Sequence, residues 1–153
     1  GGGSTELSIL NNSKIIKSKS FKIGGVRLIN NLVSEKTWSD FDSWIKENLI
    51  KIENLKLIGF GGNINKIFKI SETKFGKPLT SKKLNSIIAR LEKMSNKEKS
   101  LLFRLNPERL DIIVPSGKVY KFLIERLNLK EIHVPKIGLV DGMVSELINK
   151  LKT

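Results

Sequence analysis

The most constraining stretch of the chain is the apolar run at residues 55–60 (LKLIGF), which is followed directly by Gly61 and Gly62. A short run without a polar face is typical of a strand covered on both sides, as in a parallel sheet. The two glycines allow a tight turn into a short helix, which we expect over residues 63–71. The sequence therefore predicts a buried strand that ends at a place for a ligand.

The remaining segments predict a hairpin, a series of helices and a second strand. Residues 4–10 and 14–23 interleave β-branched and polar residues around a polar turn, which predicts a β-hairpin. Pro115, inside a helical pattern, predicts a kink or a split. Helices are expected at residues 26–33, 37–52 (capped by Thr37 and Ser39), 80–94 (capped by Thr80), 95–105 (capping box Ser95 and Glu98), 106–127 (starting at Asn106-Pro107) and 139–151, with a strand at 130–135. This order predicts a mixed sheet with helices on its faces, an α/β domain.

Length and composition limit the class of protein. The chain has 153 residues, of which 39% are hydrophobic, so it can bury the core of a single domain. The absence of cysteine excludes disulfides and thiolate metal sites, and we expect a reducing, cytoplasmic location. No apolar run approaches the ~18 to 20 residues that span a bilayer, so we expect no membrane partner.

The chain is strongly basic, with a formal net charge of +13 from 28 Lys and Arg against 15 Asp and Glu. Such a field attracts polyanions such as polyphosphate, nucleotides or nucleic acid. Scattered lysines also result from a composition rich in Lys, Ile and Asn, and they form no single block here. The charge supports an anionic partner without naming it.

The opening GGGSTEL has two interpretations, a flexible linker or a loop that binds phosphate and leads into a strand. Successive glycines let the backbone approach an anion and aim its N–H groups at the oxygens, and hydroxyls add further donors. In the second interpretation, the phosphate-binding residues are Gly1, Gly2, Gly3, Ser4 and Thr5.

Several segments together carry a family resemblance: GGGSTEL, FKIGGVRL, IGFGGNINKIF, ERLDIIVPSGKVYKFLIERLNLKEIHV and KIGLVDGMVSELI, in this order. They resemble the second half of the exopolyphosphatase/guanosine pentaphosphate phosphatase family, over essentially the whole chain. The family's loop reads Asp-x-Gly-Gly-Gly-Ser-Thr-Glu, and this chain begins after the Asp. The resemblance favours the phosphate loop over the linker.

The resemblance implies a fold and a place in a larger protein. The fold is an α/β ribonuclease H-like (actin-like ATPase) subdomain, with a mixed sheet that starts with an antiparallel hairpin. Family members place the active site in the cleft between two such subdomains. We therefore expect residues 1–153 to be the second, C-terminal subdomain, with the N-terminal subdomain of the same protein as its missing partner, and homodimer formation stays open.

The resemblance also implies roles for individual residues. Glu6 is the expected catalytic residue, holding Mg²⁺ or orienting water, and a solvated strand residue is the alternative. Further candidates for the cleft are Arg27, Gly61, Gly62, Arg109, Ser116 and Gly117. The alternatives are a structural ion pair for Arg27, a tight strand-to-helix turn for Gly61 and Gly62, and close helix packing for Gly117. Asn63 stands where the family usually has Thr, and in the closing motif Val140 and Asp141 replace the usual basic residue and Glu. We expect His133, Trp38, Trp44 and Tyr120 to be structural.

Two functions follow from these patterns. In the first, the full-length protein is a phosphohydrolase that removes terminal phosphate from inorganic polyphosphate or guanosine pentaphosphate with Mg²⁺, while this fragment alone is inactive. In the second, the chain is a non-catalytic basic module that binds polyphosphate or RNA. We favour the phosphohydrolase, and we therefore regard nucleic acid as an improbable partner.

Overall fold

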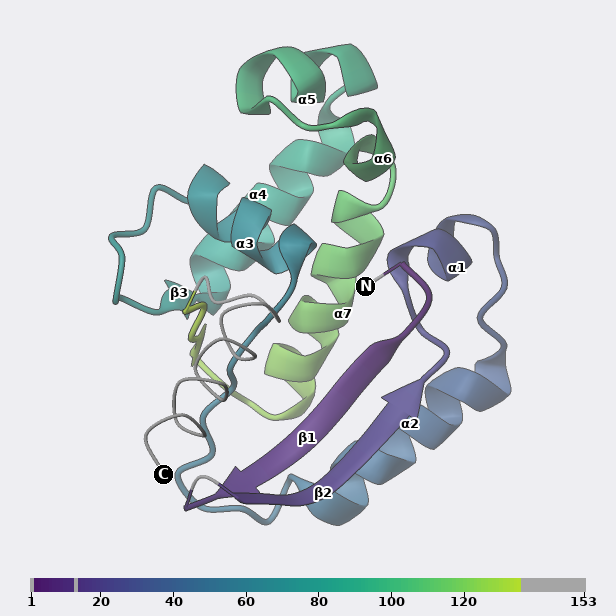
Figure 1. The fold of residues 1–153 in the computed structure, drawn as a ribbon, viewed down its shortest axis with the longest axis vertical. Coiled ribbons are helices and arrows are strands. Elements are labelled where there is room, and N and C mark those ends of the chain that lie inside the picture. The colour runs from purple at the N-terminus through teal and green to yellow at the C-terminus, as the bar shows by residue number, and fades with distance from the viewer. Residues whose placement is uncertain (1, 13, 136–153) are drawn as a thin grey trace, which may run out of the picture.

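The computed structural model describes residues 2–12 and 14–135, so the helix expected at 139–151, with Val140 and Asp141, lies outside the described residues. The chain begins with the predicted antiparallel hairpin of β1 (Thr5–Asn11) and β2 (Lys14–Phe21) (Figure 1). The register pairs Thr5 with Phe21 and Glu6 with Ser20, and a bulge follows Ile9. The hairpin therefore carries the opening loop at the start of its first strand.

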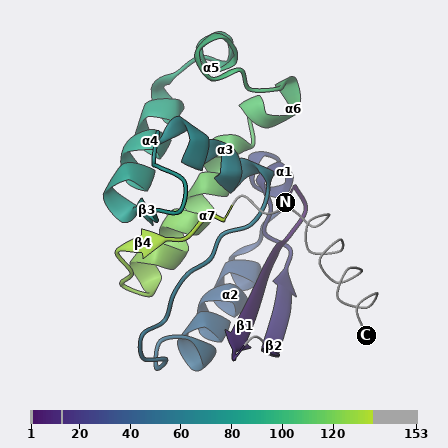
Figure 2. The same ribbon diagram turned by 60° about the vertical axis from the view of Figure 1, so that its left-hand side comes forward.

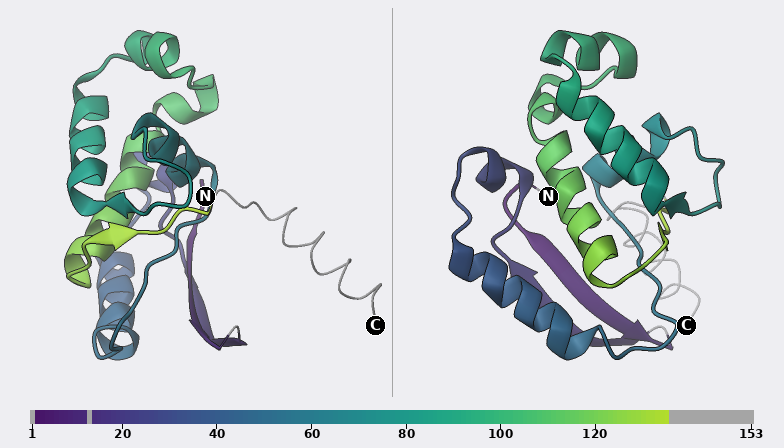
Figure 3. Two further views of the ribbon diagram at one scale, coloured as in Figure 1. Left: turned by 90° about the vertical axis from the view of Figure 1, so that its left-hand side faces the viewer. Right: turned by 180° about the vertical axis from the view of Figure 1, so that it is seen from behind.

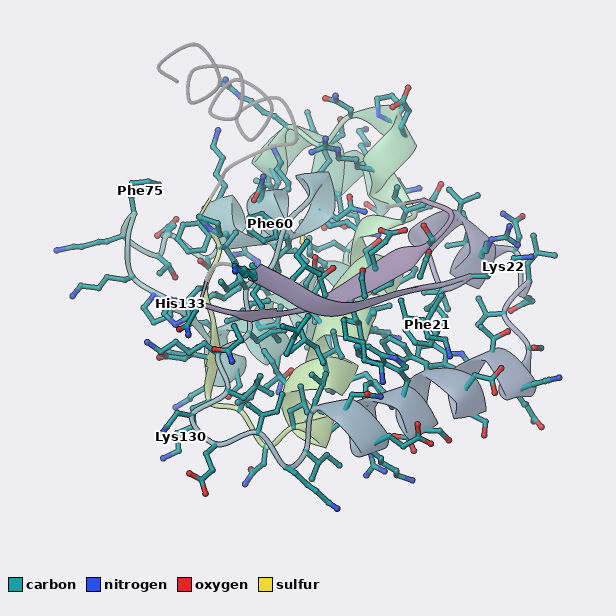
Figure 4. The ribbon with its side chains drawn as sticks, turned by 60° about the horizontal axis from the view of Figure 1, so that its bottom comes forward. Phe21, Lys22, Phe60, Phe75, Lys130 and His133 are labelled. Carbon is teal, nitrogen blue, oxygen red and sulfur yellow. The ribbon has the colours of Figure 1, made fainter. Side chains whose placement is uncertain are left out.

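Two helices follow the hairpin, α1 (Gly25–Ile29) and α2 (Glu35–Asn48). Ser34, and not Thr37 or Ser39, caps α2, because the Ser34 hydroxyl accepts the Thr37 N–H and the helix starts one turn earlier than expected. α2 covers one face of the hairpin, and Phe21 points from β2 toward it (Figure 4). The helix therefore buries the apolar side of the hairpin.

The middle of the chain consists of α3 (Gly62–Ile70), β3 (Leu79–Thr80), α4 (Ser81–Lys93) and α5 (Asn96–Phe103). The predicted caps are confirmed: the Thr80 hydroxyl accepts the Lys83 N–H, and Ser95 forms a capping box with Glu98. These local signals place the helix starts where the sequence predicts them.

The last described elements are α6 (Pro107–Leu110), α7 (Ile113–Arg126) and β4 (Glu131–Ile132). The pattern expected as one proline-interrupted helix is split into α6 and α7, and Pro115 lies in the first turn of α7, where a missing N–H costs little. β4 pairs antiparallel with β3.

The run at residues 55–60 differs from the prediction. Its pairing is one parallel bridge between Ile58 and His133, supported by hydrogen bonds of 2.8 Å on either side. Gly59 is buried against Ile132 and Tyr120, but Ile58 and Phe60 are 49% and 59% exposed. The run is therefore an extended segment with a single covered face, because the described elements pack only on the side of Gly59.

Two hydrophobic clusters fill the interior. One joins the hairpin to α2, and the other joins α3, α4 and the β3–β4 pair. α7 contributes to both clusters and runs between α4 and the hairpin (Figures 2 and 3). The start of α7 thereby lies where the two halves of the molecule meet. None of the helices within residues 2–12 and 14–135 is long and apolar enough to cross a membrane.

Candidate phosphate-binding site

The opening loop is folded against the segment after β2. The Gly2 carbonyl accepts the Val26 N–H at 2.9 Å, and Arg27 Nε donates to the Gly3 carbonyl at 2.9 Å. The Thr5 hydroxyl donates to the Ile23 carbonyl at 2.6 Å, so it anchors the loop rather than offering its proton to a ligand. Gly1 lies outside the described residues. These contacts hold the backbone of residues 2–5 in one shape, which a flexible linker would not require.

Gly24 allows this packing. A Cβ on Gly24 would lie 2.4 Å from the Gly2 carbonyl oxygen and 2.6 Å from the Gly3 carbonyl carbon. By contrast, nothing lies within 4 Å of the place where a Cβ on Gly3 would stand, and Gly3 is exposed. The loop therefore presents an open backbone on one side while its other side contacts Gly24.

Glu6 lies at the start of β1, exposed beside the loop. Its Oε1 atom accepts hydrogen bonds from the Ser4 and Ser20 hydroxyls. The bond from Ser4, with a smaller contribution from Ser20, lowers the pKa of the Glu6 carboxyl against the opposing effect of partial burial. The geometry thus holds an ionised carboxylate next to the glycine loop.

The start of α7 lies directly behind the loop. A Cβ on Gly25 would stand 2.7 Å from the Ser116 hydroxyl, and Asn63 Nδ2 donates to that hydroxyl at 2.8 Å. Ser116 is buried, with 8% of its surface exposed. Gly117 faces the other way, where a Cβ would be 3.0 Å from Ile88, so the structure places it in helix packing and not in a cleft.

Gly61 and Gly62 form the turn into α3. Gly61 has φ of 119°, a conformation that favours glycine, and it is the N-cap of α3. Arg109 NH1 donates to the Gly62 carbonyl at 3.2 Å, and a Cβ on Gly62 would lie 2.7 Å from Arg109 NH2. Glycine here therefore makes room for a guanidinium.

The candidate residues thus form one continuous series of contacts. It leads from the loop through Gly25, Ser116 and Asn63 to Gly62 and Arg109. Arg27 borders the series at the loop end. Among the predicted residues that the structure describes, Gly117 points elsewhere, and the others lie along this series: Gly2, Gly3, Ser4, Thr5, Glu6, Arg27, Gly61, Gly62, Arg109 and Ser116.

Three contributors were missed by sequence reasoning. Ser20 holds Glu6, Gly24 makes space for the loop, and Asn63 binds Ser116. The glycine pair in FKIGGV is a signal that could have identified Gly24. The Ser20 contact depends on the hairpin register, and the Asn63 contact joins residues 53 positions apart.

Residues predicted to be structural lie in structural positions. Trp44 is buried in the cluster under the hairpin, and Trp38 packs against Phe122 with ring centroids 5.5 Å apart. The Tyr120 hydroxyl donates to the Phe60 carbonyl at 2.9 Å, and burial raises the pKa of Tyr120 to about 12. His133 contributes backbone to the bridge with Ile58.

The residues that could hold a metal are few. Within the described part of the chain, no group of three or more His, Cys, Asp or Glu side chains comes together. Glu6 is the carboxylate of the site, and Mg²⁺ in phosphoryl-transfer sites is often held by one or two carboxylates together with substrate phosphates. The donor set fits one protein ligand to a magnesium ion that a phosphate substrate would complete.

The elements described above define an α/β domain with a glycine loop beside a carboxylate, and comparison with known proteins identifies the family. The sequence model of the Ppx/GppA phosphatase family matches residues 1–151. The chain belongs to the Ppx/GppA phosphatase family.

Individual relatives agree with this assignment. The chain is 31% identical over 146 residues to a bifunctional 3-dehydroquinate synthase/phosphatase of Fusobacterium nucleatum, covering 82% of this chain and 22% of that protein. It is similar in structure to the Aquifex aeolicus Ppx/GppA family member (TM-score 0.72, 22% identity, 98% of this chain and 55% of that one). An exopolyphosphatase from Cytophaga hutchinsonii gives TM-score 0.74 at 20% identity, with 98% and 55% covered. These likenesses confirm the predicted ribonuclease H-like fold, and the chain spans about half the length of these solved relatives.

Proposed function

We propose that the chain is the phosphate-binding half of a phosphohydrolase that removes the terminal phosphate from inorganic polyphosphate or guanosine pentaphosphate. The observation that carries the proposal is the packing of the glycine loop against residues 23–27, with an ionised Glu6 beside it. Membership of the Ppx/GppA phosphatase family supports the reaction class. The similar protein from Cytophaga hutchinsonii is an exopolyphosphatase, which supports polyphosphate as the substrate.

Each part of the site has a task in this reaction. The Gly3 backbone N–H, at an exposed residue, lies where it can contact terminal phosphate oxygens, while the Ser4 hydroxyl donates to Glu6. Arg27 and Arg109 supply positive charge at the two ends of the site. Water attacks the terminal phosphorus, the bridging P–O bond breaks, and the shortened chain leaves with the electron pair. Bound Mg²⁺ would neutralise charge on the transferring oxygens.

Glu6 is expected to act in this reaction as an ionised carboxylate. Its hydroxyl donors keep the carboxylate ionised, which suits a group that ligates a cation or orients a water molecule. A general base, expected by resemblance in the N-terminal subdomain, would then take the proton from the attacking water. We therefore expect residues 1–153 alone to release little phosphate.

The alternative is a non-catalytic module that binds polyphosphate. The observation that favours it is the high positive charge, combined with the absence, among the described residues, of any group of three or more His, Cys, Asp or Glu side chains that could hold a metal ion. The two functions differ in turnover. Purified full-length protein incubated with Mg²⁺ and polyphosphate should release inorganic phosphate repeatedly, whereas a binding module would bind the polymer without shortening it.

A further inference from the structure

A cluster of four basic side chains, which includes Arg109, lies at the end of the site farthest from the glycine loop. It consists of Arg109, Lys66 and Lys69 of α3, and Arg104 in the connection between α5 and α6. Figure 1 shows α3 beneath this connection. The cluster therefore joins two elements that are distant in sequence.

Geometry fixes Lys66 in the cluster. Its Nζ donates to the Arg104 carbonyl at 3.2 Å, and Arg104 occupies a left-handed conformation (φ 48°) at the end of α5. Arg109 contacts the start of α3, the helix that carries Lys66, because its guanidinium donates to the Gly62 carbonyl. Hydrogen bonds to the backbone thus hold Lys66 and Arg109 in the cluster, and Lys69 follows Lys66 by three residues on α3.

Within residues 2–12 and 14–135, these cations form no ion pair. The five ion pairs found within the described residues involve Lys46, Lys118, Lys121, Arg126 and His133, all outside the cluster. Partial desolvation and the repulsion from Lys69, Arg109 and Arg104 lower the pKa of Lys66. Uncompensated positive charge of this kind is relieved when an anion binds.

We propose that Lys66, Lys69 and Arg104 form a second anion subsite, which binds the non-reacting phosphates of a linear polyphosphate whose reacting end lies at the glycine loop. The proposal rests on the proposed function and deepens it, because it assigns the choice of chain length to these three side chains. Arg109 lies between the loop and the subsite, where the contacts of the two parts meet. A long chain should reach Lys66, and a short one should end before it.

The test uses the full-length protein with Lys66→Gln, which removes the charge but keeps an N–H donor for the Arg104 carbonyl. Lys36→Gln is the matched control, because Lys36 is an exposed lysine on α2, in the other half of the molecule. Phosphate release is measured with tripolyphosphate and with long-chain polyphosphate over a range of salt concentrations.

The expected result is specific to long chains. Lys66→Gln should raise KM for long-chain polyphosphate by about 3- to 10-fold with little change in kcat, and leave KM for tripolyphosphate nearly unchanged. If polyphosphate behaves like other phosphate polymers, loss of one contact should reduce the slope of log affinity against log salt by about 0.7 to 0.9. Lys66→Arg should restore the wild-type values. Equal effects of Lys66→Gln and Lys36→Gln, or an equal effect on both substrates, would overturn the proposal.

Direct binding separates failure of this proposal from failure of the proposed function. Calorimetric titration of each variant with the same two polyphosphates requires no turnover. If the wild-type protein releases no phosphate but Lys66→Gln still weakens long-chain binding selectively, the proposed subsite is supported and the proposed phosphohydrolase function is contradicted. If single-stranded RNA of similar charge competes as well as long-chain polyphosphate, the cluster is a general polyanion surface and the inference is wrong.

Discussion

The Ser20 hydroxyl donates a hydrogen bond of 3.1 Å to Oε1 of Glu6, directly across the hairpin. The carboxylate is therefore positioned from two sides, since Ser4 reaches it from the loop before β1 and Ser20 reaches it from β2. The next residue pair on the same face of the hairpin is Ser8 with Ser18, whose hydroxyls form a hydrogen bond of 2.9 Å with each other and not with Glu6.

The Ser20 contact gives a pH-dependent prediction. Ser20→Ala removes one donor to the ionised carboxylate, so the pKa of Glu6 should rise toward its ordinary value. Glu6 would then gain its proton at a higher pH as the solution is acidified, and the acid limb of the kcat/KM profile should move to higher pH. The profile of the full-length protein is compared with that of Ser18→Ala, which breaks only the neighbouring hydroxyl pair. Superimposable profiles for wild type and Ser20→Ala would contradict the role of Ser20.

Removing the charge of Glu6 should affect rate and not folding. Glu6→Gln keeps the size of the side chain and an oxygen that accepts both hydroxyls, so stability should change by no more than ~0.5 kcal/mol at this exposed position. Loss of the electrostatic contact should slow phosphate release by about 10²-fold. Rates at saturating Mg²⁺ and melting curves are measured for both full-length proteins. Unchanged rates at equal stability would remove Glu6 from the reaction.

Two glycines near the loop should respond differently to alanine. Gly24→Ala places a Cβ 2.4 Å from the Gly2 carbonyl oxygen, so the backbone must shift, and we expect a loss of about 1–3 kcal/mol in the free energy of unfolding. Gly3→Ala meets no atom within 4 Å and should leave stability nearly unchanged while it obstructs the approach of an anion to the loop. Urea denaturation and phosphate release measure the two effects. A Gly24→Ala protein as stable as Gly3→Ala would show that the loop does not pack as described.

Tyr120 allows a spectroscopic test, because it is the single tyrosine of the chain. Burial raises its pKa to about 12 from the model-compound value of 10.0, so its phenol should stay protonated well above pH 10 in the folded protein. Because the unfolded chain loses this proton first, stability should decline as the pH rises from about 10 toward 12. Ultraviolet absorbance titration measures the phenolate, with the urea-unfolded chain as reference. A folded-state transition near pH 10 would mean that Tyr120 is solvated.

Loss of the Tyr120 hydroxyl should have a small energetic effect. Tyr120→Phe removes the hydrogen bond to the Phe60 carbonyl, which should cost about 1 kcal/mol in the free energy of unfolding. Because this bond holds the segment before Gly61, the variant should also weaken phosphate binding at the Arg109 end. An unaltered melting temperature together with unaltered binding would assign no structural role to the hydroxyl.

Local chemistry made much of the fold predictable. The capping residues Thr80 and Ser95 act through contacts three residues away, so their signals are complete within a short window of sequence. The cap of α2 was misplaced because Ser34 and Thr37 are both good capping residues, and their own contact occurs only when the helix starts at the first. The prediction that Ile58 and Phe60 are buried was wrong, because burial depends on which elements pack over a segment and not on the segment alone.

The candidate site was predictable where a motif carries its own chemistry. Glycines beside hydroxyls and a carboxylate indicate phosphate binding without knowledge of the fold. The contact between Ser20 and Glu6 could not be predicted from the sequence, because it depends on the hairpin register. A change of one residue in that register would turn Ser20 to the other face. The place of Gly117 was equally open, since only the packing of Ile67 and Ile88 against it distinguishes a core glycine from a cleft glycine.

The position of α7 between the two hydrophobic clusters has a consequence for how the protein unfolds. Ile113 and Ile124 belong to one cluster, while Val119 and Leu123 belong to the other, so neither cluster can lose its ordered packing while α7 keeps all of its contacts. The two halves should therefore unfold in one cooperative transition, with no stable intermediate in which a single cluster survives. Because Ser116 lies on the same helix, local opening that releases it would require separating both halves, and the amide protons of α7 around Ser116 should be among the last to exchange.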